Sequence, residues 1–214
     1  MREPREALPR PRRADAQATR ARLVAVGRTA FGADGLDVPI RAIAARAGVG
    51  AATVYRHFPS RQDLVAAVLA EHVAACEAEM ASALADPDPG HALRVTLLRF
   101  AERQVQDRHL NAALLGGHPA GEPFAQARRA HADAFATLVD RARAVDAVRP
   151  GVTVADARVA LMAMTAFRAL PAERASAVVG RLTGLLLAGI GIGVDGHPGV
   201  SSTAKPSRSG DTAG

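Results

Sequence analysis

The sequence predicts an all-α protein in which a small N-terminal helical domain precedes a larger helical domain. None of the 214 residues lies in a stretch with the sustained apolar/polar alternation of a strand. Alanine, the strongest helix former, is abundant, and glycines and prolines separate the segments with helical periodicity. Because Trp is absent and aromatic residues make up only 3% of the chain, we expect aliphatic side chains to fill the core.

Three helices are expected near the N-terminus, at about residues 16–31, 39–47 and 51–58. Gly35 and Gly48 follow the first and second of these, in the position where a glycine ends a helix in a left-handed conformation. Only three residues separate the second helix from the third. Two short helices joined by so short a turn are typical of a helix-turn-helix.

A long fourth helix is expected from Ser60 to about Leu84. Ser60 and Asp63 have the spacing of a capping box, which predicts that the helix begins here. The sequence Asp-Pro-Asp-Pro-Gly at 86–90 ends it. Its apolar stripe recurs every three or four residues, at Val65, Leu69, Val73, Cys76, Met80 and Leu84.

The remainder of the chain predicts four more helices. Segment 111–121, with three glycines and a proline, is expected to be a loop or a broken helix, and Pro171 lies directly before the last helix, as suits a helix start. The four expected helices cover about residues 91–107, 122–145, 154–169 and 172–190.

Positive charge is concentrated at the N-terminus. Residues 1–60 hold eleven arginines and five acidic residues, a net charge of +6, and residues 61–214 sum to zero. A polyanion is therefore the expected partner of the first quarter of the chain. We expect 1–14 to be a disordered basic arm and 195–214 a disordered tail, because both lack apolar periodicity.

Other classes of protein are disfavoured by composition. Cys76 is the single cysteine, so no internal disulfide can form, which fits a reducing compartment. The N-terminus has no apolar segment of a signal peptide, and the most apolar run, 182–194, is too short to span a bilayer. We expect a cytoplasmic protein with no membrane partner, divided into a DNA-binding domain at 15–62 and a C-terminal domain at 63–194.

Residues 43–49 (IAARAGV), 53–58 (TVYRHF) and 60–64 (SRQDL) resemble the DNA-binding domain of tetracycline-repressor-type (TetR family) regulators. The similarity covers about residues 19–69. It implies a three-helix helix-turn-helix domain that binds double-stranded DNA, followed by helices that form a homodimer and enclose an effector pocket. Members of the family are bacterial, and the large excess of arginine over lysine also favours a bacterial source.

The resemblance also implies which residues contact DNA. Tyr55 matches a tyrosine near the centre of the recognition helix, and Thr53 and His57 match phosphate contacts. Arg61 matches a basic phosphate clamp, and Arg41 a position that reads a base in some members. The full expected set is Arg41, Ala51, Ala52, Thr53, Tyr55, Arg56, His57 and Arg61, with Arg10, Arg12 and Arg13 of the arm.

Details of this interface differ from the family pattern. Ala51 and Ala52 offer only apolar contact, for example to a thymine methyl group, so specificity is expected from other side chains. Pro39 and Gly50 replace a capping Ser or Thr found in many members. The arm is expected either to enter the minor groove or to bind DNA non-specifically.

The last two expected helices carry a broad apolar surface that one domain cannot cover alone. A four-helix dimer interface is the favoured interpretation, and a purely intramolecular packing role is the alternative. Small residues four apart, among them Gly180 and Gly184, permit close approach of helices. The expected interface residues are Val159, Val178, Leu182, Gly184, Leu185 and Leu186.

An effector pocket is expected among the C-terminal helices. His131 is the polar exception in an apolar stripe, and is either a hydrogen-bonding ligand contact or a satisfied core histidine. Arg103 and Gln104 are expected on the surface. The expected pocket residues are Cys76, Phe100, His131, Phe135, Met162 and Phe167.

Catalysis and metal binding find little support. His72 and Cys76 lie four residues apart on one helix, but the further ligands of a closed metal site are missing, and no catalytic or cofactor-binding motif occurs. We therefore expect that the protein is not an enzyme and that it binds no metal and no cofactor. The sequence predicts a DNA-binding transcriptional repressor released from a palindromic operator by a small molecule. One alternative is a non-catalytic DNA-binding factor without an effector. The other is a small helical enzyme, which would require a clustered acid/base site, and the sequence shows none.

Overall fold

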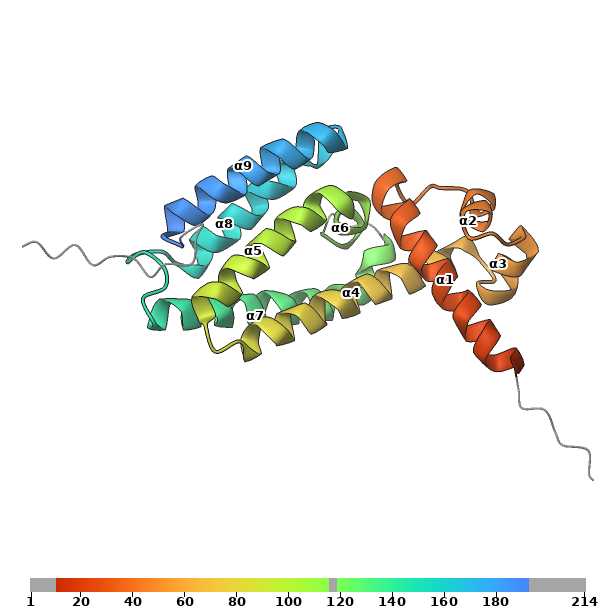
Figure 1. The fold of residues 1–214 in the computed structure, drawn as a ribbon, viewed down its shortest axis with the longest axis horizontal. Coiled ribbons are helices and arrows are strands. Elements are labelled where there is room, and N and C mark those ends of the chain that lie inside the picture. Colours follow the sequence, from red (N-terminus) through yellow and green to blue (C-terminus); the bar gives the residue numbers. More distant parts are fainter. Residues whose placement is uncertain (1–10, 116–118, 193–214) are drawn as a thin grey trace, which may run out of the picture.

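The computed structural model describes residues 11–115 and 119–192, and it confirms the all-α prediction. Within these ranges there are nine α-helices, two short 3-10 helices and no strand. Helices α1–α3 form a head at one end of an elongated molecule, and α4–α9 form the body (Figure 1). No helix in the described ranges is both long and apolar enough to cross a membrane.

The head consists of α1 (Pro11–Asp34), α2 (Ile40–Arg46) and α3 (Ala51–His57). Helix α1 begins earlier than predicted, so residues 11–14 are helical rather than part of a disordered arm; a proline at the first helical position suits this start. Gly35 ends α1 with a φ of 96°. The head core buries Leu23, Phe31, Ile43, Val54, Phe58 and Leu64.

The body is built on two long helices that run side by side, α4 (Arg61–Ala85) and α7 (Ala125–Ala144), with α5 (Pro89–Gln106) packed on both (Figure 1). Ser60 and Asp63 make the predicted capping box at the start of α4. Helix α5 begins at Pro89, with Asp88 as its N-cap, inside the segment 86–90 that was predicted to end the fourth helix.

The segment predicted as a loop or broken helix contains a helix, α6 (Arg108–Leu115), followed by a 3-10 helix, η1 (Pro119–Phe124). Helix α6 packs against α1 and η1. Leu110, Ala113 and Leu114 bury their side chains in the head core, and this tertiary burial stabilises a helix too short to persist alone.

The C-terminal layer consists of α8 (Val154–Thr165), η2 (Ala166–Ala169) and α9 (Ala172–Ile190). Thr153 and Asp156 form a second capping box at the start of α8. Gly191 ends α9 with a φ of 85°. Helix α9 packs along α5, so that α8 and α9 cover the side of the body opposite α4 and α7 (Figure 1).

Head and body meet where α1 crosses the corner between α5 and α6. A Cβ atom on Gly32 would lie 3.1 Å from the Gln106 carbonyl oxygen and 3.2 Å from Asp107 Oδ1, so a larger residue here would force the corner to shift by a few tenths of an ångström. Arg108 donates to the Ala33 carbonyl oxygen at 3.1 Å and to the Leu170 carbonyl oxygen at 3.3 Å. One side chain thereby connects the end of α1 to the start of α9.

We expect Gly32→Val to destabilise the protein by about 1–3 kcal/mol, because the added side chain must displace backbone at the corner. Ala25→Val, on an exposed position of the same helix, is the matched control and should cost less than 1 kcal/mol. Urea unfolding followed by circular dichroism measures both. Equal losses for the two variants would contradict the close contact.

Candidate nucleic-acid interface and effector cavity

The turn between α2 and α3 positions the expected recognition helix. Gly48 has a φ of 65°, a conformation that disfavours other residues. Gly50 is the N-cap of α3 with a φ of −76°, and it makes no side-chain cap bond; Pro39 makes none at α2 either. Both helices therefore begin without the hydroxyl cap that is common in the resembled family.

Helix α3 has one buried face and one exposed face. Val54 and Phe58 are 0% and 2% exposed and fix the helix to the head core. On the opposite face Tyr55 is 49% exposed, and Ala52 and Arg56 are also exposed. The remaining expected contacts, Ala51, Thr53 and His57, are half-buried at its edges.

The arginines of the head differ in how far they are engaged by the protein. Arg41 is exposed, whereas Arg46 makes an ion pair of 2.9 Å with Asp34. Arg61 donates to the Leu36 carbonyl oxygen and lies 3.3 Å from the Asp37 carboxylate. Because the Asp37 side chain is fully exposed, that ion pair is weak and leaves a phosphate contact by Arg61 possible.

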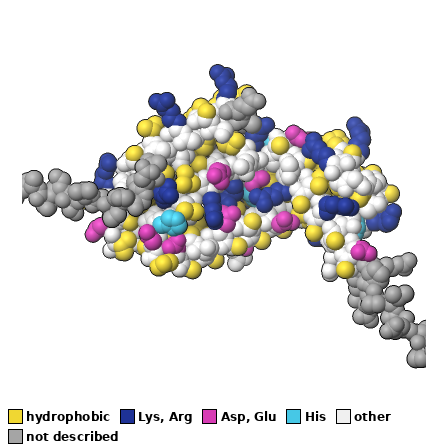
Figure 2. Space-filling view, viewed as in Figure 1, with side chains coloured by type: hydrophobic (Ala, Val, Ile, Leu, Met, Phe, Trp, Pro, Cys, Tyr) yellow, Lys and Arg dark blue, Asp and Glu magenta, His cyan; other side chains and the backbone are white. Residues whose placement is uncertain are grey.

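Cationic side chains gather over the head in Figure 2. Arg20 of α1 stacks on the Phe58 ring with its guanidinium carbon 4.9 Å from the ring centroid, which places a cation beside α3. Arg12 and Arg13 belong to α1 rather than to a disordered arm. Arg10 lies outside the described residues.

A polar network connects the head to the body. Arg28 of α1 makes a 3.0 Å ion pair with Asp107, at the α5–α6 corner. The Asp107 carboxylate raises the pKa of Arg28, mainly through this hydrogen bond. His72 of α4 lies next to the pair, with Nδ1 3.7 Å from Asp107 Oδ2. We refer to Arg28, His72, Asp107 and Asn111 as the joint network.

Asn111 fixes the orientation of His72. Its amide nitrogen donates to the Arg103 carbonyl oxygen at 2.8 Å, so its oxygen faces His72 Nε2 at 3.1 Å and accepts a hydrogen bond from that N–H. His72 Nδ1 then has no hydrogen-bond partner. The His72 side chain is only 1% exposed, and this burial lowers its pKa.

Two cavities lie between α4, α5, α6 and α7. The first, of about 110 Å³, adjoins the joint network, since His72 and Asn111 line it. We call it the apolar cavity, because most of its other walls are apolar: Val73, Phe100, Leu114, Leu115 and Ala127. Glu77 and Arg128 also line it.

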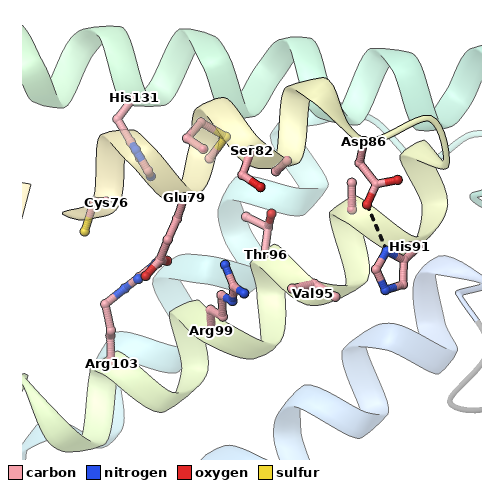
Figure 3. A pocket seen from close by; sticks show the side chains of 13 residues that line it. Cys76, Glu79, Ser82, Asp86, His91, Val95, Thr96, Arg99, Arg103 and His131 are labelled. Atoms are coloured by element: carbon pink, nitrogen blue, oxygen red, sulfur yellow. Dashed lines mark hydrogen bonds and ion pairs between the residues drawn. The ribbon is translucent and has the colours of Figure 1, made fainter. Parts of the chain in front are cut away.

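The second, of about 150 Å³, we call the polar cavity (Figure 3). Its walls include Glu79, Ser82, Asp86, His91, Thr96 and Arg99. At its far end His91 Nδ1 lies 3.0 Å from Asp86 Oδ2 (Figure 3). Cys76, Arg103 and His131 line both cavities, and we call these three residues the seam.

The structure separates the expected pocket residues into two groups. Cys76, Phe100 and His131 line the cavities. Phe135 is only 4% exposed and lies in the body core, and Met162 is 70% exposed on α8, so neither faces a cavity. Phe167 packs beside a small core cluster, with Met164 and Val179, and lines neither cavity.

The surface prediction for Arg103 and Gln104 is wrong. The Arg103 side chain is 15% exposed and pairs with Glu79 inside the polar cavity. Gln104 is 2% exposed, and neither its amide nitrogen nor its oxygen has a hydrogen-bond partner in the described residues. Sequence spacing did not identify the cavity role of Glu79, Thr96 or Arg99, because polar residues on amphipathic helices normally face solvent.

Helices α8 and α9 leave large apolar side chains without cover. Val159 and Leu185 are each 64% exposed, and Val178 is also exposed. Leu182 and Leu186 are half-buried against the cluster containing Val179, so they stabilise the body and also border this surface. A Cβ on Gly184 would meet nothing within 4 Å, which leaves room for a close neighbour.

A helix-turn-helix head on a helical body with internal cavities is the architecture of a bacterial transcriptional regulator. The sequence profile described as "Bacterial regulatory proteins, tetR family" matches residues 23–68. A second profile, "Transcriptional regulator SbtR-like, C-terminal domain", matches residues 88–192. The chain belongs to the TetR family of DNA-binding transcriptional regulators.

Solved structures support this membership. A TetR regulator from Mycobacterium vanbaalenii is 36% identical, with a TM-score of 0.59, over 80% of this chain and 98% of that chain. A TetR regulator from Streptomyces coelicolor is 29% identical, with a TM-score of 0.60, over 80% and 97%. A TetR-family regulator from Agrobacterium tumefaciens shares the fold at 22% identity and a TM-score of 0.64, over 82% and 98%. No curated protein sequence matched the chain.

No group of three or more His, Cys, Asp or Glu side chains in the described ranges is arranged to hold a metal ion. His72 and Cys76, which have a metal-ligand spacing in the sequence, instead serve the joint network and the seam. Burial raises the pKa of the Cys76 thiol, so it stays protonated near neutral pH.

The lowered pKa of His72 predicts that acid destabilises the protein. The unfolded chain binds a proton at His72 below about pH 6.5, whereas the folded chain binds it only at lower pH. Stability is therefore full above about pH 6.5 and decreases as the pH falls from there towards the folded pKa. Melting temperatures between pH 7.5 and 5.0 measure this, and His72→Gln, which can still donate to Asn111, should reduce the pH dependence. An unchanged dependence in His72→Gln would contradict the assignment.

Proposed function

We propose that this protein is a homodimeric repressor that binds a palindromic operator and is released by a small molecule. The observation that carries the proposal is the exposed face of α3, on which Ala52, Tyr55 and Arg56 lie free above a buried anchor of Val54 and Phe58. A short helix held by its back can enter a major groove with its front.

The dimer is supported by the apolar surface of α8 and α9. A second copy would bury Val159, Val178 and Leu185, and a symmetric interface suits a surface centred on one helix pair. Two heads in a dimer would reach successive major grooves, about 34–36 Å apart. Such a dimer recognises a palindrome and acts in the cytoplasm, where the chromosome is accessible.

Release by an effector is supported by the shared position of His72 and Asn111. Both side chains line the apolar cavity and also belong to the joint network that holds α1. A ligand that fits the cavity better when these side chains shift will favour a different head position. Operator affinity then falls by the ratio of ligand affinities for the two states.

We expect Tyr55→Ala to lower operator affinity at least tenfold, because it removes the largest exposed side chain of α3 from the groove. The operator is first selected from random DNA, and binding is measured by fluorescence anisotropy at several salt concentrations. Arg46→Ala is the matched control and should change affinity less than threefold, because Arg46 pairs with Asp34. Sedimentation should show a dimer for both variants. Full affinity in Tyr55→Ala, or binding indifferent to salt and sequence, would refute the proposal.

A substitution at the joint should affect DNA binding in a different way. Asp107→Asn keeps the shape of the side chain and removes the charge that holds Arg28. We expect operator affinity to fall several-fold, because the heads lose their fixed spacing, while the slope of affinity against salt stays unchanged. If Arg56 contacts a phosphate, Arg56→Ala should lower the affinity and should also reduce the slope of log affinity against log salt concentration by about one. A reduced salt slope in Asp107→Asn would contradict a positioning role.

A further inference from the structure

The seam between the two cavities carries information about ligand chemistry. Cys76, Arg103 and His131 are the three side chains that any ligand extending from one cavity into the other must pass. They come from three different helices, α4, α5 and α7, and Figure 3 shows them near one another at one end of the polar cavity, with Glu79 beside Arg103.

The seam has no net charge. The Arg103 guanidinium is neutralised by Glu79. Burial, reinforced by the nearby Arg103 cation, lowers the pKa of His131, and the Cys76 thiol stays protonated, so both are uncharged near neutral pH. A carboxylate at the seam would lose hydration and find Arg103 already paired with Glu79, and an ammonium group there would meet the Arg103 cation. An ionic group at the seam is therefore disfavoured, although Arg99, Glu77 and Arg128 line the cavities beyond it.

One polar atom of the seam has no partner. His131 Nδ1 is buried and makes no hydrogen bond within the described residues. A neutral imidazole nitrogen either donates or accepts, depending on the tautomer. A hydroxyl group satisfies it in both cases, since a hydroxyl donates and accepts, and it can also accept from the Arg103 guanidinium.

Cavity size limits the rest of the ligand. The apolar cavity, of about 110 Å³, has walls of Val73, Phe100, Leu114 and other apolar side chains. An apolar cavity of about 150 Å³ accommodates benzene in another protein, and this cavity is smaller but continues into the seam, so a single ring is the largest apolar group that it can take. The polar cavity suits the hydrated end of the molecule.

We infer that the two cavities bind an uncharged molecule of about the size of phenol, with its ring in the apolar cavity and its hydroxyl group at the seam against His131. This inference rests on the proposed function, because it names the ligand class of the same effector site. The site is expected to bind a neutral hydroxylated ring more tightly than an organic acid, an amine or a plain hydrocarbon.

Calorimetric titration of the full-length protein without DNA tests the ligand class with three probes of similar size: phenol, benzoate and toluene. We expect phenol to bind at least fivefold more tightly than either of the others at pH 7.5. Benzoate binding as tightly as phenol would overturn the inference, and so would toluene binding as tightly, because the seam would then contribute nothing.

Two substitutions test the placement. His131→Leu should weaken phenol binding about fivefold to tenfold, the loss expected for one buried hydrogen bond, and leave toluene binding within twofold. Ala127→Leu, which fills the apolar cavity, should weaken both phenol and toluene at least tenfold. Ala130→Leu, at an exposed position of the same helix that lines neither cavity, is the matched control and should change neither. Unchanged phenol affinity in both His131→Leu and Ala127→Leu would overturn the placement.

A separate measurement distinguishes the ligand class from the proposed function. Fluorescence anisotropy on the selected operator reports whether phenol lowers DNA affinity at a concentration that saturates the site. Phenol that binds and lowers DNA affinity supports both the inference and effector release. Phenol that binds at the seam without changing DNA affinity supports the ligand class and contradicts effector release, whereas preferential binding of benzoate contradicts the ligand class alone.

Discussion

The ion pair between Arg28 and Asp107 constrains most of this molecule. Asp107 is only 7% exposed, and a buried carboxylate is costly unless a cation and hydrogen bonds compensate it. Arg28 supplies that cation from α1 at 3.0 Å, so the head cannot rotate on the body without exposing or abandoning the charge. Gly32 allows the backbones to approach closely enough for the pair to form. The position of the recognition helix relative to the body therefore depends on this ion pair and on the close approach at Gly32, together with the apolar core that α1 shares with α4 and α6.

The residues around this ion pair also border the proposed effector site in the body. Asp107 ends α5, and Asn111 and His72 connect that end to the wall of the apolar cavity. His72 Nδ1, which has no hydrogen-bond partner, faces the Asp107 carboxylate at 3.7 Å, so a small shift of the His72 ring changes the environment of the charge that holds α1. A ligand therefore needs no long pathway of contacts, because the cavity wall and the joint network share two side chains.

Local signals made much of the fold predictable. Gly35 and Gly48 end helices in left-handed conformations as expected, and Ser60 with Asp63 caps α4, because these features depend only on neighbouring residues. Tertiary contacts decided the rest. Helix α6 forms in a glycine-rich segment because Leu110 is buried in the head core. Met162 faces outward, although its flexible apolar side chain was expected to line the cavity. Sequence periodicity identifies an apolar face but does not say which neighbour covers it, and it gave no sign that Gln104 is buried.

The division of charge along the chain suits the two chemically opposite partners that we propose, DNA and an uncharged small molecule. The net charge of +6 in residues 1–60 acts on a polyanion over roughly 8–10 Å in physiological salt, which guides the head to DNA. Residues 61–214 are neutral in sum, and at the seam Arg103 is paired with Glu79, so the seam itself offers no unpaired cation to an anion. Discrimination in the body then depends on shape and on single hydrogen bonds, which salt hardly changes. In the proposed regulator the head and the cavities share only the joint network, so a substitution there is expected to alter the coupling between DNA binding and ligand binding without altering either binding surface.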